Sequence, residues 1–78
     1  MPICSYLVHV KEQKLDSVVN QLEHKSECSV FPASNKDLLV LVTETNDDKR
    51  EMGLTEEINT IEDIECMALT YANFEGEQ

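Results

Sequence analysis

An α+β fold is predicted for this 78-residue chain by three observations. Four short segments are rich in apolar and β-branched residues, as strands are. They cover residues 3–10, 27–31, 37–43 and 64–72. The first and last pairs of strands are each separated by a stretch with apolar residues at helical spacing. The resulting order, strand–helix–strand–strand–helix–strand, is that of the ferredoxin-like βαββαβ sandwich. We therefore expect a four-stranded antiparallel sheet with the first and third strands central, two helices on one face and the other face open.

The first half of the chain supplies one strand and one helix. Residues 3–10, ICSYLVHV, carry apolar side chains in both alternating positions, so both faces of this strand are suited to apolar contact. Residues 11–25 follow, with an i, i+3, i+4, i+7 stripe that predicts an amphipathic helix. The stripe consists of Leu15, Val18, Val19 and Leu22.

The second half begins with a predicted hairpin, in which the strands at residues 27–31 and 37–43 are joined by turn residues. Helix-start chemistry follows, because Asp47 or Asp48 can cap a helix and Glu51 lies three residues after Asp48. A final strand at residues 64–72 completes the order. We expect residues 1–73 to form a single domain and residues 74–78 an acidic flexible tail.

Side-chain alternation predicts which face of each strand meets the helices. The predicted core positions are Cys4, Tyr6, Val8, Val10, Cys28, Val30, Leu38, Val40, Val42, Met67, Leu69 and Tyr71. The predicted open face holds Ile3, Ser5, Leu7, Ser29, Phe31, Leu39, Leu41, Cys66, Ala68 and Thr70. Its centre is apolar, and a contiguous exposed apolar patch usually marks a binding surface.

Composition excludes several classes of function. Sixteen acidic residues against six basic ones give a formal net charge of −10, which disfavours nucleic acid and anionic membranes and favours a basic peptide or protein. The three cysteines form no C-x-x-C pair, so the sequence predicts neither a zinc site nor a redox motif, and no cofactor is expected. Secretory signals, membrane spans and catalytic motifs are also missing from the sequence. We expect a cytoplasmic protein that is not an enzyme.

Several stretches resemble the NapD family, the small cytoplasmic chaperones of the periplasmic nitrate reductase. They are the opening strand ICSYLVHVK, the strand DLLVLVTE and the late IEDIECMALTY. The resemblance extends from Ile3 to Tyr71. It implies a ferredoxin-like fold that binds the twin-arginine signal peptide of the catalytic subunit. The bound precursor would then be held back from the Tat translocon while its molybdenum cofactor is inserted, and the chaperone itself would bind no metal.

A twin-arginine signal has a basic segment followed by an apolar one, and such a peptide can fold into an amphipathic helix on an apolar surface. The residues expected to bind it are Ser5, Leu7, Phe31, Leu39, Leu41, Cys66, Ala68 and Thr70. Carboxylates can hold arginine in bidentate fashion. The candidates for the two arginines are Asp37, Glu44, Glu65, Glu75 and Glu77.

Two alternatives remain open at the level of sequence. The chain could be a regulatory small-molecule domain resembling an ACT domain, although no glycine-rich loop follows the first strand. It could also be a structural homodimer subunit that buries the open face against its own copy. We expect a monomer, which would leave that face free.

Overall fold

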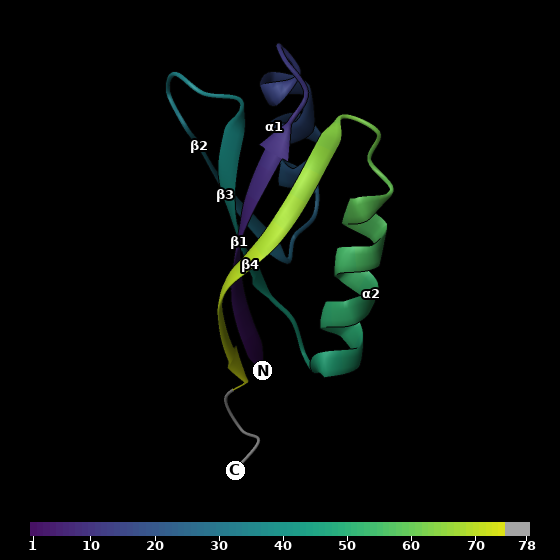
Figure 1. Ribbon diagram of the computed structural model, residues 1–78. Coiled ribbons are helices and arrows are strands. Elements are labelled where there is room, and N and C mark those ends of the chain that lie inside the picture. Colours follow the sequence, from purple (N-terminus) through teal and green to yellow (C-terminus); the bar gives the residue numbers. More distant parts are fainter. Residues whose placement is uncertain (75–78) are drawn as a thin grey trace.

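The computed structural model describes residues 1–74 and shows the predicted βαββαβ order (Figure 1). The elements are β1 (Pro2–Val10), α1 (Leu15–Glu23), β2 (Cys28–Pro32), β3 (Leu38–Glu44), α2 (Asp48–Asn59) and β4 (Ile64–Phe74). The expected acidic tail lies outside the described residues, apart from Phe74 at the end of β4.

The four strands form one antiparallel sheet in the order β2-β3-β1-β4. The predicted fold class is confirmed, including the central position of β1 and β3. Such an order arises when the two β-α-β halves interleave, so β1 pairs with β3 and β4 and not with β2, its nearest strand in sequence.

The core lies between one face of this sheet and both helices. Burial alternates along the whole of β1, as expected for a strand covered on one side. The strand contributes Cys4, Tyr6, Val8 and Val10 to the core, all less than a tenth exposed. Both helices complete it with fully buried apolar residues, namely Val18, Leu22, Leu54 and Ile58.

The face assignment for β3 was wrong. Leu39 and Leu41 are fully buried, whereas Val40 is 38% exposed. The register explains this, because Leu39 is opposite Val8 and Leu41 opposite Tyr6, and cross-strand partners share a face. The face expected for β3 rested on Thr43, because a hydroxyl favours an exposed position. Thr43 is in fact fully buried.

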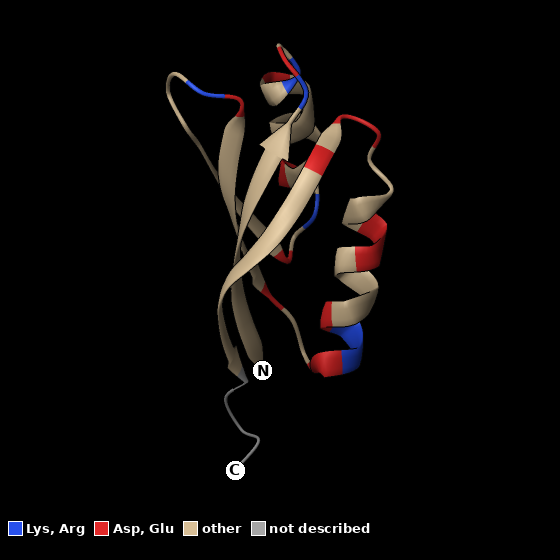
Figure 2. Cartoon of the chain, viewed as in Figure 1, with Lys and Arg blue, Asp and Glu red and all other residues tan. Residues whose placement is uncertain are grey.

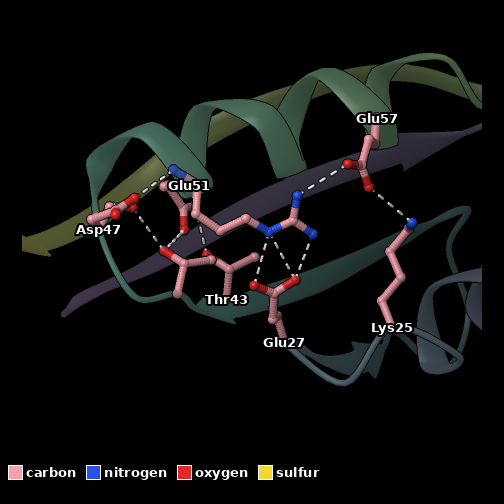
Figure 3. Close-up of polar contacts among 8 residues, drawn as sticks. Lys25, Glu27, Thr43, Asp47, Glu51 and Glu57 are labelled. Atoms are coloured by element: carbon pink, nitrogen blue, oxygen red, sulfur yellow. Dashed lines mark hydrogen bonds and ion pairs between the residues drawn. The ribbon is translucent and has the colours of Figure 1, made fainter.

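Thr43 can occupy the core because a buried carboxylate accepts its hydrogen bond. Glu51 of α2 is only 5% exposed, and its carboxylate accepts hydrogen bonds from three hydroxyl groups (Figure 3 shows Glu51 with Thr43). They are Tyr6 Oη at 2.5 Å, Thr43 Oγ1 at 2.7 Å and Thr45 Oγ1 at 2.9 Å. A buried polar group costs free energy unless it is hydrogen-bonded, so these contacts make a charged residue tolerable on the inner side of α2.

The inner face of β4 was predicted only in part. Met67 packs against the core, but Leu69 is 57% exposed and Tyr71 is 54% exposed. Leu69 is opposite Tyr6 and Tyr71 is opposite Ser5, which leaves Thr70 as an extra residue in a β-bulge. The bulge reverses the alternation, so Leu69 stays on the helix side and Tyr71 lies on the open side.

Helix α1 begins later than the sequence suggested, whereas α2 begins at one of the two predicted caps. Residues 11–14 form a turn in which Gln13 has φ of 65°, so α1 begins at Leu15. Asp47 is the cap of α2, because its carboxylate accepts a hydrogen bond from the backbone N–H of Arg50 at 2.8 Å. Glu51 lies in the buried cluster, so its role is to anchor α2 to β3 and β1.

Candidate functional site

The sheet surface opposite the helices is the candidate site, and we call it the open face. Two rows of register partners cross all four strands. The first row, from β2 to β4, consists of Phe31, Val40, Leu7 and Ala68. The second row consists of Ser29, Val42, Ser5 and Tyr71. Two triplets of register partners, Leu38–His9–Cys66 and Glu44–Ile3–Asn73, extend the face toward its two ends.

The two complete rows of the open face expose apolar, aromatic and small polar side chains, with no charged residue among them. Phe31 is 58% exposed, and Val40, Leu7 and Val42 are partly exposed beside it. In Figure 2 the ribbon of the sheet is almost entirely free of charged residues, which gather on the helices and loops. Water on one face of an antiparallel sheet normally selects polar residues there. This face is therefore suited to contact with an apolar partner.

The sequence placed five of its eight binding candidates correctly on this face: Ser5, Leu7, Phe31, Cys66 and Ala68. Leu39 and Leu41 were wrong, because they lie in the core. Thr70 is exposed in the bulge, where its hydroxyl donates to the backbone oxygen of Ser5 at 3.0 Å.

Four open-face residues were missed, namely Leu38, Val40, Val42 and Tyr71. The first three follow from the reversed assignment of β3. The hydroxyl of Thr43 gave the wrong face for the residues of β3. The pairing of Leu41 with Tyr6 and of Leu39 with Val8 gives the correct face, because Tyr6 and Val8 lie in the core. For Tyr71, the alternation of β4 contains no sign of a bulge.

The acidic candidates lie at the margins of the open face. Glu44 ends β3 and is opposite Ile3, near the start of β1. Asp37 and Glu65 lie at the other end of β1, where Val10 donates its N–H to the backbone oxygen of Asp37 and pairs with Ile64. All three are exposed, and none joins an ion pair within residues 1–74. Glu75 and Glu77 lie outside the described residues.

On the helix side of the molecule, two other carboxylates form ion pairs with basic side chains. Arg50 of α2 contacts Glu27 through Nη2 at 2.6 Å and Glu57 through Nη1 at 3.0 Å, and Lys25 reaches Glu57 at 3.4 Å (Figure 3). Hydrogen bonds from Arg50 are the main cause of a lowered pKa at both Glu27 and Glu57. This network ties the start of β2 to α2 and leaves these carboxylates less available to a partner.

A groove of about 640 Å³ lies on the same side, between the last turns of α1 and α2. Its lining includes His24, Lys25, Glu57 and Ile61. The Lys25–Glu57 ion pair lies within it, so its two main charges already neutralise each other. No nucleophile with an adjacent base is found among its lining residues.

The thiols of Cys4 and Cys28 are not activated for chemistry. Burial raises the pKa of Cys28 to about 11, and burial together with the negative charge of Glu51 raises that of Cys4. Cys66 is exposed on the open face. Within residues 1–74, no three His, Cys, Asp or Glu side chains are grouped closely enough to hold a metal ion.

Fold and site together define a small ferredoxin-like domain whose main accessible feature is an uncharged sheet face. The model of the family described as NapD protein matches residues 1–76, and the chain therefore belongs to the NapD family. The solution structure of the Escherichia coli Tat proofreading chaperone protein NapD superposes with a TM-score of 0.81 at 22% identity. That match covers 97% of this chain and 81% of the other, and it shows a shared fold.

No curated protein sequence matches the chain. None of the helices described in residues 1–74 has the length and apolar character needed to cross a bilayer.

Proposed function

We propose that this protein is a non-enzymatic cytoplasmic chaperone that binds a twin-arginine signal peptide, that of the periplasmic nitrate reductase catalytic subunit. By holding the peptide it restrains Tat export of the precursor until the cofactor is inserted. Membership of the NapD family supports the role, as does the structural match to NapD of E. coli, a Tat proofreading chaperone. The observation that carries the proposal is the exposed centre of the open face, which holds no charged side chain, with carboxylates at its margins that join no ion pair within residues 1–74.

The open face has the dimensions to receive one helix. Neighbouring strands lie about 4.8 Å apart, so four strands span roughly 14 Å between the outer two. An α-helix with its side chains is about 10–12 Å wide. Leu7, Val40 and Val42 provide apolar contact for the h-region of the peptide, and the small residues Ser5 and Ala68 allow its backbone to come close.

The charge of the protein also favours binding of this peptide. The formal net charge of −10 attracts the basic n-region, and exposed carboxylates such as Asp37, Glu44 and Glu65 can take guanidinium groups in bidentate fashion. Because these carboxylates lie beside the open face and not within it, the apolar centre can contact the h-region while the arginines reach the margin.

Calorimetric titration with the synthetic twin-arginine signal peptide of the reductase encoded in the same genome tests the proposal. We expect saturable one-to-one binding that Val40→Glu abolishes, because the new carboxylate would lie unpaired beneath the apolar side of the helix. Met52→Glu is the matched control, since Met52 is 64% exposed on α2 and lies off the open face. Binding by Val40→Glu equal to that of wild type would show that the open face does not bind the peptide.

The proposal also requires a monomer in the absence of peptide. Analytical ultracentrifugation at micromolar concentration measures this directly. A stable dimer that Val40→Glu dissociates would instead favour a structural homodimer built on the open face.

A further inference from the structure

The bulge in β4 gives Tyr71 a position that strand alternation alone would not. Tyr6 is opposite Leu69 and Ser5 is opposite Tyr71, with Thr70 between. In a regular strand, residues two apart share a face, so Leu69 and Tyr71 would point the same way. The extra residue separates them, leaving Leu69 on the helix side and Tyr71 on the open face.

A hydrogen bond holds this irregularity in place. Thr70 Oγ1 donates to the backbone oxygen of Ser5 at 3.0 Å, bridging β4 to β1 at the register shift. The bond lies directly beside Tyr71, so it fixes the strand where the ring emerges.

The Tyr71 ring has substantial surface left to bury. It is 54% exposed, and its neighbours across the row are Ser5, Val42 and Ser29, two of which are short. The ring therefore lies beside a part of the open face where the side chains are short and extend less far from the sheet. An amphipathic aromatic residue in such a place contributes apolar area and a hydroxyl at little conformational cost.

A second aromatic ring stands on the opposite edge strand. Phe31 of β2 is 58% exposed and lies one row away from Tyr71. Three strand spacings and a two-residue offset place the two attachment points roughly 16 Å apart. That separation exceeds the width of a helix with its side chains, which is roughly 10–12 Å, so the two rings can flank one helix.

We propose that Tyr71, turned onto the open face by the Thr70 bulge, is a specificity-determining residue that grips the apolar segment of the bound peptide from the β4 side. Thr70 is a positioning residue that acts through Tyr71. The inference rests on the proposed signal-peptide function and assigns one wall of its site.

The chain offers a closely matched pair for the test. Tyr71→Ala and Leu69→Ala each truncate a large side chain that is about half exposed, on the same strand but on opposite faces. We expect Tyr71→Ala to weaken signal-peptide binding about tenfold or more, as for an interface anchor, and Leu69→Ala to remain within about twofold of wild type. Equal affinities for all three proteins, or equal losses in both variants, would overturn the proposal.

Two further variants test position independently of truncation. Thr70→Val should weaken binding with little change in the urea midpoint, because the residue is exposed, while Thr70→Ser should retain wild-type affinity through its hydroxyl. Wild-type affinity in Thr70→Val would show that Thr70 does not position Tyr71.

A fluorescence experiment tests contact between the peptide and position 71. The natural chain has no tryptophan, so Tyr71→Trp adds a single reporter whose emission should shift to the blue on addition of peptide. Unchanged emission at saturation would contradict contact at this position.

The outcomes separate this inference from the proposed function. Should the wild-type protein fail to bind the twin-arginine peptide at all, the chaperone function itself is wrong. Should wild type and Tyr71→Ala bind alike, the chaperone function stands and the role of Tyr71 is rejected.

Discussion

Removing the hydroxyl of Tyr6 should destabilise the domain substantially, although the change is a single oxygen atom. Tyr6 Oη donates to the buried Glu51 carboxylate at 2.5 Å, and Tyr6 is only 7% exposed. Tyr6→Phe leaves that carboxylate, which is only 5% exposed, with its two threonine donors. A hydrogen bond to a charged group contributes about 1.5–3 kcal/mol, which sets the expected loss.

Urea unfolding followed by far-ultraviolet circular dichroism measures the effect. For a chain of this size the urea dependence is about 1 kcal/mol per molar, so the midpoint should fall by about 1.5–3 M. Thermal unfolding should show a decrease in Tm of roughly 6–24 °C.

Tyr71→Phe is the control, because it removes the only other tyrosine hydroxyl of the chain from a residue that is 54% exposed. We expect it to stay within about 0.5 kcal/mol of wild type, as exposed substitutions do. A loss in Tyr6→Phe no larger than that of the control would show that the Glu51 cluster does not anchor α2.

The remaining predictions concern salt, thiols and pH. Peptide affinity should fall as salt rises from 50 to 500 mM (about 14 to 4 Å in Debye length), and less so for a peptide with both arginines replaced by Gln; salt-independent affinity would exclude an electrostatic contribution. Cys66→Ser should retain peptide binding, whereas alkylation of Cys66 with a bulky maleimide should hinder it through size; equal loss in both would make the thiol itself necessary. The pKa of Cys28 is about 11 in the fold against an ordinary 9.0, so the unfolded chain releases this proton first. The contribution of Cys28 to the free energy of unfolding is therefore complete below pH 9 and is lost as the pH rises toward 11. Cys28→Ala should reduce this loss of stability at alkaline pH in urea titrations, and an unchanged pH profile would contradict the raised pKa of Cys28.

The sequence by itself determined the order of elements and the phase of β1. Every second residue from Cys4 to Val10 is buried, as alternation predicted, because this central strand pairs regularly with β3 on one side and has a helix layer over one face. The helical stripe likewise predicted the burial of Val18 and Leu22 in α1. Such patterns depend on neighbours along the chain, so one sequence suffices to find them.

Tertiary structure alone decided the phase of β3 and of the end of β4. In β3, Thr43 takes a core position because Glu51, eight residues later, brings an acceptor to it, and this sends Val40 to the open face in place of Leu39 and Leu41. In β4, a bulge held by the contact between Thr70 and Ser5, 65 residues apart, carries Tyr71 to the same face. Both outcomes depend on long-range partners for polar groups. Alternation within a single strand cannot encode them, because the satisfaction of a buried hydroxyl or a register shift is a property of two strands together.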